Sequence, residues 1–342
     1  MTWISDGAMA RLSALPELPD FSGTRYRLQG EIDRGGMGVV YAAEDTTLGR
    51  GVAIKVLRDG LARDGAQRRL ERESAIMAGL EHPGIVPVHD AGTLPDGSAF
   101  YVMKRVRGTR VDALSRSGLS LAEALRLFTR ICEPVAFAHA RGVVHRDLKP
   151  ENVMVGEFGE VIVMDWGVAK LLERSGDAAG NDVASRERPG DGAREERPPL
   201  PHVAPGAPLT SDGDVVGTRG YMAPEQERGD TAATSPRSDV WALGAILREL
   251  ATVAHPPAGR GLPRPLAAIV ARATAALPAD RYASAAELAR DVVRFVDGEG
   301  VSAYREAPWE RAGRWLRRNK TAVGVVAAYL VMRTALYLWL GR

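Results

Sequence analysis

The stretch HRDLKPENVMVGEFGEVIVMDWG, residues 145–167, places polar side chains at the ends of two short apolar runs. Its first eight residues combine a histidine, an arginine, an aspartate, a lysine and an asparagine. Each of these groups needs a polar partner if it is buried, so their density indicates a site rather than a plain connecting loop. Asp165 follows the second apolar run, where an aspartate is either a metal ligand or the first residue of a turn.

The side chains of this stretch suit phosphate chemistry. Asp147 can orient a hydroxyl group and accept its proton, and Lys149 can steady a γ-phosphate. Asn152 and Asp165 offer oxygen ligands, which the hard cation Mg²⁺ prefers. We therefore expect a phosphoryl-transfer site around residues 145–167.

Two motifs upstream fit the same chemistry, although each has a simpler reading. The glycines of IDRGGMGVV, residues 32–40, let a backbone approach phosphate oxygens closely, but a Gly-rich hairpin is often only a turn. Lys55 closes the apolar run VAIK, where a lysine is normally a solvent-facing residue, yet its ammonium could also lie beneath bound phosphates. Glu73 belongs either to a solvated acidic helix face or to a pair with Lys55.

Composition excludes several classes of protein. The chain has 342 residues, of which 45% are hydrophobic and 26% charged, so it can bury a large core in one or two domains. A net charge of +2 provides no general field that would recruit nucleic acid. Cys132 is the only cysteine and falls in a helical pattern, which excludes an intramolecular disulfide and is typical of a core residue in a reducing compartment.

The order of predicted elements indicates an α+β protein that is β-rich first and helical afterwards. Short β-like runs and one charged helix open the chain, and amphipathic helical stretches dominate the rest. The β-like runs are 26–32, 38–45, 51–57, 85–92 and 99–106, and the first helix is 63–80. The later helices are 120–142, 238–254, 264–277 and 284–298.

The remaining segments have distinct compositions. Residues 1–25 lack a secretory signal and are expected to be a lead-in. Residues 173–214 are dense in Gly, Pro and charged side chains, which predicts a disordered insertion because so little apolar surface can be buried. Residues 299–320 are expected to form a basic linker ahead of an apolar stretch.

The apolar stretch 321–340 is long enough for a transmembrane helix, and the basic residues before it satisfy the positive-inside rule. Arg333 argues against a span, because a charge there costs about 2.5–3.5 kcal/mol on insertion scales. A helix on the membrane surface or packed on protein is the alternative. The expectation is a cytoplasmic domain anchored to the inner membrane by a single C-terminal helix.

Taken together and in order, these motifs resemble the bacterial branch of the eukaryotic-like (Hanks-type) serine/threonine protein kinases. The resemblance extends from about residue 26 to 298 and includes GTRGYMAPE (217–225), DVWALG (239–244) and the arginine of DRY (280–282). DWG in place of DFG resembles a subgroup of these kinases. The family implies a two-lobed fold, with an N-lobe over 26–106 and a C-lobe over 107–298.

The resemblance also implies a role for each matching residue. Lys55 would contact the α- and β-phosphates of ATP and pair with Glu73, and Asp147 would be the catalytic base, assisted by Lys149. Asn152 and Asp165 would bind Mg²⁺, for which Mn²⁺ could substitute. The implied ATP contacts are Ile32, Asp33, Arg34, Gly35, Gly36, Met37, Gly38, Val40, Ala53, Lys55, Met103, Lys104 and Val106.

Regulatory and structural roles follow in the same way. Arg146 would help to bind an activation-loop phosphate, with Thr210 or Ser211 as the phosphosite and Thr218 facing the substrate. Glu225, Asp239 and Arg281 would support the fold. Lys149, two residues after the base, is the pattern of serine/threonine rather than tyrosine kinases.

Three departures from the family pattern stand out. Asp33 replaces the first glycine of the loop, the activation segment is lengthened by 173–214, and the region 251–265, where the family docks substrates, is short. Two functions therefore remain: an active kinase that phosphorylates protein Ser/Thr hydroxyls and itself, in trans within a homodimer, or a pseudokinase scaffold. Neither involves nucleic acid.

Overall fold

The computed structural model describes residues 18–35, 38–57, 79–166, 170–171, 220–230, 233–254 and 261–340. The chain divides into two compact units. The first unit consists of Met1–Gly108 and Met154–Ser211, and the second of Thr109–Val153 and Asp212–Arg342. The predicted boundary between lobes at residues 106 and 107 remains a prediction.

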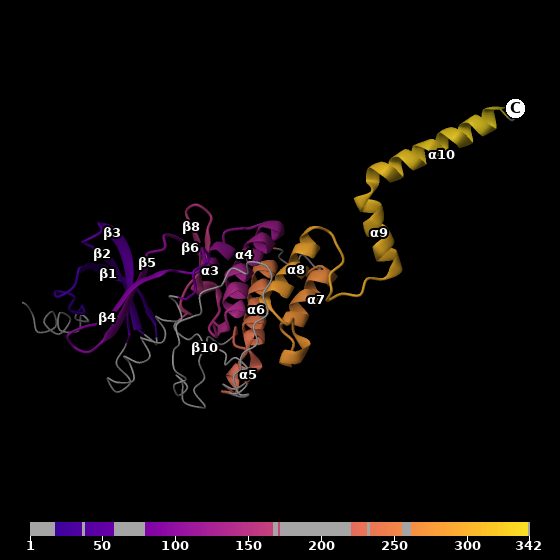
Figure 1. Cartoon of the computed structure of the whole chain (residues 1–342). Helices are drawn as coiled ribbons and strands as arrows, with labels where there is room; N and C mark the ends of the chain where they lie inside the picture. The colour runs from indigo at the N-terminus through magenta and orange to yellow at the C-terminus, as the bar shows by residue number, and fades with distance from the viewer. Residues whose placement is uncertain are drawn as a thin grey trace, which may run out of the picture. The chain divides into compact units, whose positions relative to one another are not determined.

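The first unit contains a five-stranded antiparallel sheet with the order β1-β2-β3-β5-β4 (Figure 1). All five strands were predicted. However, β4 begins at Val88 and not at residue 85, since Pro87 has no N–H to donate to a neighbouring strand. The strands are β1 (Tyr26–Gly35), β2 (Gly38–Asp45), β3 (Arg50–Leu57), β4 (Val88–Thr93) and β5 (Ala99–Lys104).

One face of this sheet forms the core of the unit. Alternate residues of the strands point to it, as the two-residue period of a strand requires. The aromatic rings of Phe21 and Phe100 meet edge to face there, with 5.0 Å between their centroids. The buried members are Phe21, Tyr26, Val39, Tyr41, Ala43, Val52, Ile54, Val56, Leu94, Phe100 and Val102.

A second stretch of chain brings the predicted metal ligand into this unit. Strands β8 (Val153–Gly156) and β9 (Val161–Val163) pair with each other, and β9 contacts the segment before β4. The backbone N–H of Val163 donates to the carbonyl of Gly84 at 2.8 Å. This bond fixes the end of β9, two residues before Asp165. Three short strands complete the set: β6 (Gly108–Arg110), β7 (Val143–Val144) and β10 (Lys170–Leu171).

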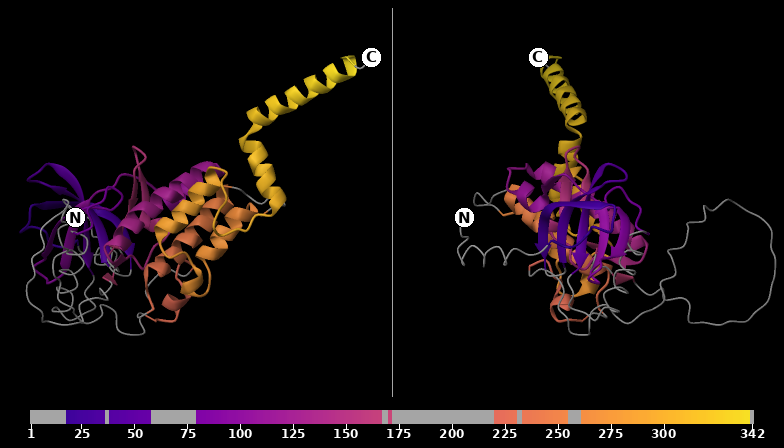
Figure 2. Two further views of the ribbon diagram at one scale, coloured as in Figure 1. Left: turned by 45° about the vertical axis from the view of Figure 1, so that its right-hand side comes forward. Right: turned by 90° about the vertical axis from the view of Figure 1, so that its left-hand side faces the viewer.

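The second unit is helical, as predicted. Helix α4 (Leu121–Ala140) starts at a capping box in which the Ser120 hydroxyl accepts from the Glu123 N–H, and the Glu123 carboxylate accepts from the Ser120 N–H. Its buried face packs on α6 (Pro236–Ala254) and α8 (Ala285–Val296), which lie alongside it in Figure 2. Cys132 is fully buried on α4, which confirms it as a core residue, and burial raises the pKa of its thiol.

Shorter helices complete the second unit. They are α3 (Val111–Ser115), α5 (Pro224–Glu227) and α7 (Arg264–Ala273), with 3₁₀ turns η1 (Pro150–Asn152) and η3 (Pro278–Asp280). Two further helices, α9 (Pro308–Arg318) and α10 (Lys320–Leu340), follow at the C-terminal end. The predicted helix 63–80 lies outside the described residues except for its last two, and the predicted insertion 173–214 lies entirely outside them.

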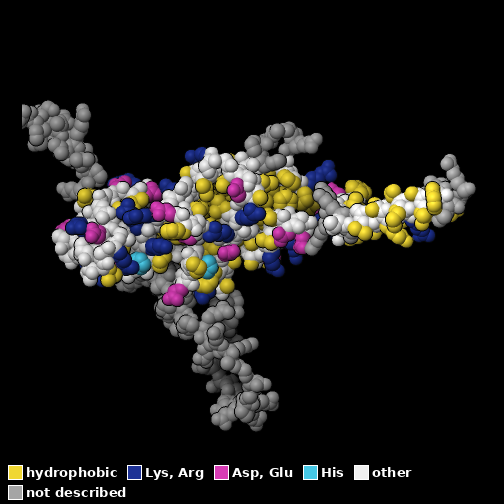
Figure 3. Space-filling model, turned by 90° about the horizontal axis from the view of Figure 1, so that it is seen from above, with side chains coloured by type: hydrophobic (Ala, Val, Ile, Leu, Met, Phe, Trp, Pro, Cys, Tyr) yellow, Lys and Arg dark blue, Asp and Glu magenta, His cyan; other side chains and the backbone are white. Residues whose placement is uncertain are grey.

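The prediction of a transmembrane segment is wrong for this structure. The apolar stretch does form a helix, α10, and hydrophobic side chains gather along it in the space-filling view (Figure 3). However, none of the helices in the described part of the chain is long and apolar enough to cross a membrane. Arg333 lies within this stretch, and its charge opposes insertion into hydrocarbon.

Gly244 marks the closest approach of α6 to α7. A Cβ atom at this position would lie 2.7 Å from the Ala273 Cβ and 3.2 Å from the Ala273 carbonyl carbon. Real Cβ atoms do not approach other carbons this closely, so the two helices can pack at this separation only over a glycine.

We expect Gly244→Ala to lower the free energy of unfolding by about 1–3 kcal/mol, because the added methyl group forces α6 and α7 apart. Urea denaturation of the two proteins measures the difference. Gly324→Ala is the matched control, since a Cβ there meets nothing within 4 Å. A Gly244→Ala protein as stable as the Gly324→Ala protein would contradict the proposed close packing.

Candidate active site

The catalytic-loop residues predicted from the sequence lie together in the second unit. After Lys149 the chain enters the 3₁₀ turn η1, which brings Asn152 back toward Asp147. The Asn152 side-chain amide donates to the Asp147 carbonyl at 2.8 Å, and the Lys149 Nζ lies 3.3 Å from the Asp147 Oδ2. The loop therefore holds a carboxylate, an ammonium and an amide within one small volume.

The buried carboxylate of Asp239, in the first turn of α6, holds this loop through its backbone N–H groups. Its Oδ2 accepts from the His145 N–H at 2.8 Å, and its Oδ1 accepts from the Arg146 N–H at 2.9 Å. The His139 Nε2 lies 2.8 Å from Oδ2. Burial would raise the pKa of Asp239, but the hydrogen bond from His139 and the charges of His139 and His145 outweigh it and hold the pKa below its usual value.

The backbone of the loop is strained at Arg146. Its φ angle is 74°, in the left-handed region that costs a non-glycine residue about 1–3 kcal/mol. The two hydrogen bonds from Asp239 help to hold this conformation. They thereby set the direction in which the chain enters Asp147.

The predicted structural pair Glu225 and Arg281 forms a buried, bidentate ion pair. The Arg281 Nη1 and Nη2 atoms donate to the Glu225 Oε1 and Oε2 at 2.7 and 2.8 Å. The Ser238 hydroxyl adds a bond to Oε1 at 2.8 Å. Burial would raise the pKa of Glu225, but the Arg281 hydrogen bonds outweigh it and lower the pKa. This pair ties α5 to α6 and to the segment after η3.

Four of the predicted ATP residues, on β2, β3 and β5, share one face of the first unit's sheet. Val52, Ile54 and Val56 of β3 face the core, so Ala53 and Lys55 face the opposite side. Strand pairing sets Lys55 opposite Val40 of β2, and Ala53 opposite Met103 of β5. The four side chains Val40, Ala53, Lys55 and Met103 therefore lie on the same face, away from the core.

Lys55 and Asp165 meet on this unit. The Lys55 Nζ forms an ion pair with the Asp165 Oδ1, although the two residues lie 110 positions apart in sequence. Asp165 has a φ angle of 58°, again in the left-handed region, so its carboxylate is held in an uncommon backbone conformation. Trp166 is fully buried, and its indole N–H donates to the Val163 carbonyl at 3.2 Å.

The glycine-rich loop is described at its two ends only. Gly38 passes so close to β3 that a Cβ atom would lie 2.2 Å from the Val56 carbonyl oxygen, so no larger residue fits. Asp33 is exposed, and its Oδ1 accepts from the Arg34 N–H at 2.9 Å. Gly36 and Met37 lie outside the described residues, as do Glu73, Thr210, Ser211 and Thr218.

The remaining predicted ATP contacts lie at strand ends. Ile32 is half exposed on β1, Gly35 ends that strand, and Lys104 ends β5 as an exposed residue with Val106 just beyond it. Arg34 forms an ion pair with Glu31.

The donor set for a metal is small. Within the described ranges, no group of three or more His, Cys, Asp or Glu side chains could hold a metal ion. The Asn152 amide in the second unit and the Asp165 carboxylate in the first each offer an oxygen of the kind that Mg²⁺ prefers, and their role as its ligands remains a prediction.

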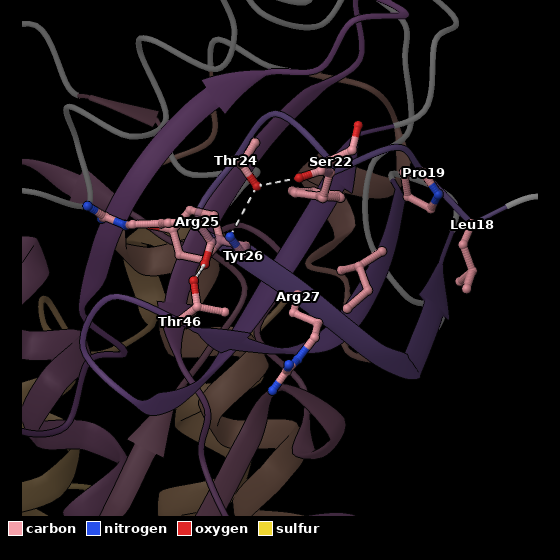
Figure 4. Close-up of a pocket in the computed structure, with 10 residues that line it drawn as sticks. Leu18, Pro19, Ser22, Thr24, Arg25, Tyr26, Arg27 and Thr46 are labelled. Atoms are coloured by element: carbon pink, nitrogen blue, oxygen red, sulfur yellow. Dashed lines mark hydrogen bonds between the residues drawn. The ribbon is translucent and has the colours of Figure 1, made fainter.

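A pocket of about 420 Å³ opens elsewhere on the first unit (Figure 4). It is lined by residues 18–19, 21–22, 24–28 and 46, and the Thr24 and Thr46 hydroxyls bond to the backbone around it. None of the predicted ATP residues lines it. We therefore assign this pocket no part in the site.

Sequence reasoning missed several residues around the catalytic loop. His139 contacts Asp239, and the Gln226 side chain donates to the Arg146 carbonyl at 2.8 Å. Tyr221, just before α5, donates from its hydroxyl to Glu249 on α6. His139 could have been noticed as a polar residue inside the otherwise apolar stretch VAFAHA, whereas Gln226 follows the charged Glu225 and gives no such signal.

A family model for the protein kinase domain matches residues 26–262. The chain belongs to the protein kinase family. The family resemblance drawn from the motifs is confirmed, as is the kinase fold with a β-rich N-lobe and a helical C-lobe, whereas the DWG subgroup remains a prediction.

The chain is similar to curated kinases from bacteria. It is 33% identical over 312 residues to the serine/threonine-protein kinase PknD of Chlamydia caviae, covering 80% of this chain and 31% of the relative. It is 34% identical over 313 residues to PknB of Mycobacterium tuberculosis, covering 83% of this chain and 45% of the relative. The kinase thus spans less than half the length of these relatives.

A solved structure supports the fold alone. The PknI kinase domain of Mycobacterium tuberculosis superimposes with a TM-score of 0.53 at 24% identity, covering 79% of this kinase and 95% of that chain.

We expect Arg281→Met to lower the free energy of unfolding at pH 7 by about 3–5 kcal/mol, because the Glu225 carboxylate would stay buried without its partner. Since the folded pKa of Glu225 is lowered, the wild-type pair stabilises the fold above the ordinary glutamate pKa. That stability is lost as pH falls through the folded pKa.

The stability difference between Arg281→Met and wild type should therefore shrink between pH 7 and pH 4, as urea denaturation at each pH would show. Arg290→Met, at an exposed arginine of α8, is the control and should change stability little at either pH. A pH-independent difference would mean that the ion pair is not the source of the effect.

Proposed function

We propose that this chain is a serine/threonine protein kinase that transfers the γ-phosphoryl group of ATP to a protein hydroxyl. The observation that carries the proposal is the grouping of Asp147, Lys149 and Asn152 on a loop anchored by Asp239. Family membership and the names of the relatives support the same reaction.

In the proposed reaction, the hydroxyl oxygen of the substrate attacks the γ-phosphorus and the bond to the bridging oxygen of ADP breaks. The Asp147 carboxylate orients the hydroxyl and accepts its proton. Lys149, whose Nζ lies 3.3 Å from the Asp147 Oδ2, is placed to offset the negative charge on the transferred group. Both side chains act from the same loop, so their separation is set by local backbone geometry.

The Asn152 hydrogen bond decides which of its amide atoms could bind a cation. Its Nδ2 donates to the Asp147 carbonyl, which leaves Oδ1 as the ligand that the amide would present. Mg²⁺ held by the Asn152 Oδ1 would supply positive charge that offsets the negative charge of the phosphates. Mn²⁺, which also accepts oxygen ligands, could take the same place.

ATP would bind over the face of the first-unit sheet that carries Val40, Ala53 and Met103, with the apolar side chains against the adenine. Lys55 would contact the α- and β-phosphates. The Lys55 ammonium also pairs with Asp165. The same side chain would therefore hold both a phosphate of ATP and the proposed metal-binding carboxylate in position. The roles of the glycine-rich loop and of Glu73 remain predictions.

Substrates, regulation and partners are further parts of the proposal. Autophosphorylation in trans within a homodimer, at Thr210 or Ser211, would use Arg146 to bind the phosphate, with Thr218 facing the substrate. The dependence on ATP and the single cysteine favour a cytoplasmic kinase domain. No observation favours the pseudokinase alternative.

We expect Asp147→Asn to lower autophosphorylation and peptide phosphorylation by about 10²–10⁴-fold, because the amide cannot accept the proton. Incorporation of label from γ-labelled ATP measures this, with Asp297→Asn, at an exposed aspartate of the same unit, as the control. Equal labelling of the Asp147→Asn and wild-type proteins would refute the proposal of an active kinase and favour the pseudokinase scaffold.

Asp165 and Trp166 should behave differently although they are adjacent. We expect Asp165→Ala to abolish transfer, because it removes a metal ligand and the partner of Lys55. Trp166→Phe should keep measurable transfer and lose about 1–3 kcal/mol of stability, since the smaller ring leaves a cavity in the core and the hydrogen bond to the Val163 carbonyl disappears. The same labelling assay and a urea titration test both, and an inactive Trp166→Phe protein that is still folded would contradict this separation.

A further inference from the structure

Gln226, in the short helix α5, contacts the backbone immediately before the proposed catalytic base. Its Nε2 donates to the carbonyl oxygen of Arg146 at 2.8 Å, and its Oε1 accepts from the N–H of Ala223 at 3.2 Å. The side chain is 8% exposed. Gln226 is thus a nearly buried amide with both of its ends engaged by backbone groups.

The orientation of this amide follows from its partners. A backbone N–H can only donate and a carbonyl oxygen can only accept, so Oε1 must face Ala223 and Nε2 must face Arg146. Glutamate in the same place could satisfy Ala223 but would set a carboxylate oxygen against the Arg146 carbonyl. Methionine, of similar length, would satisfy neither.

The bonded carbonyl belongs to the peptide group that joins Arg146 to Asp147. Arg146 has a φ angle of 74°, and its N–H is held by the Asp239 Oδ1 at 2.9 Å. The Gln226 bond holds the other end of the same residue. Together the two bonds hold the peptide groups on both sides of Arg146, the second of which leads into Asp147.

The anchor of Gln226 is itself rigid. The preceding residue, Glu225, forms the buried ion pair with Arg281 and accepts from Ser238. The Gln226 backbone N–H also donates to the Ala223 carbonyl at 2.9 Å. A shift of α5 would therefore be transmitted through the glutamine amide to the peptide group before Asp147.

We infer that Gln226 is a positioning residue for the reaction: its amide sets the orientation of the Arg146–Asp147 peptide and so the aim of the catalytic carboxylate. The inference rests on the proposed role of Asp147. A direct hydrogen bond thus connects α5 to the peptide group immediately before the base, in addition to the Glu225–Arg281 pair, which supports the fold.

Two substitutions in the full chain test the inference. Gln226→Met has no donor for the Arg146 carbonyl at any pH, so we expect kcat to fall by about 10- to 100-fold while the KM for ATP stays within about two-fold. Gln226→Glu lacks a donor only while its carboxyl is ionised, and burial raises the pKa of such a group. Once protonated, that carboxyl can donate to the Arg146 carbonyl.

The ratio of the Gln226→Glu kcat to the wild-type kcat should therefore rise as pH falls from 8 to 5.5, whereas the same ratio for Gln226→Met should stay flat. Effects of pH that variant and wild type share cancel in the ratio. Each rate is divided by the concentration of ATP-binding sites, which is measured with a fluorescent ADP analogue. Unfolded protein therefore does not contribute to the calculated kcat. If the methionine variant does not fold, the glutamate series decides alone.

The outcomes separate the inference from the function. A Gln226→Met protein with wild-type kcat and a lowered melting temperature would show a purely structural role and overturn the inference, as would a glutamate ratio that is flat or falls with pH. If Asp147→Asn is inactive in the same assay, the proposed function stands in either case. If Asp147→Asn is as active as wild type, the proposed function is rejected, and the inference, which depends on the role of Asp147, is rejected with it.

Discussion

The buried carboxylate of Asp239 holds the loop that contains the proposed catalytic base, Asp147. Removing a carboxylate from water is costly, and the cost is offset here because two backbone N–H groups and a histidine ring bind its two oxygens. The N–H donors belong to His145 and Arg146, so the carboxylate replaces the partners that these groups would have in regular secondary structure. The left-handed backbone of Arg146 persists because both of its ends are held.

The same principle recurs one step away at Glu225 and Arg281. A buried ion pair contributes little unless its remaining hydrogen-bonding groups are satisfied, and here Ser238 and three backbone carbonyls complete the set. The pair fixes α5, and α5 presents Gln226 to the loop. The second unit thus builds its site from a short series of buried polar groups, each of which stabilises the next.

Much of the fold could be predicted because its signals are local. Strands β1 to β3 and β5 appear as short β-like runs separated by glycine-bearing turns, and α4, α6, α7 and α8 as amphipathic stretches with helical spacing. The stretch 321–340 shows the limit of this approach. Its helix was predicted correctly, but its apolar length suggested a membrane span that the structure does not bear out. The mean hydropathy of the stretch is high although it contains Arg333. In a bilayer, however, the charge of Arg333 would lie at one depth in the hydrocarbon and would oppose insertion there.

The sequence by itself determined which chemical groups are present and in what order, because HRDLKPEN and DWG supply carboxylates, an ammonium and an amide whatever the fold. It could not show which polar groups meet. Asp239 lies 93 positions from Arg146, Gln226 lies 80 positions from it, and Lys55 lies 110 positions from Asp165. Only the tertiary structure decided those pairings. Side-chain chemistry and strand or helix period are short-range properties of the chain, whereas a buried polar group takes its partner from whichever distant segment the packed core brings within hydrogen-bonding distance.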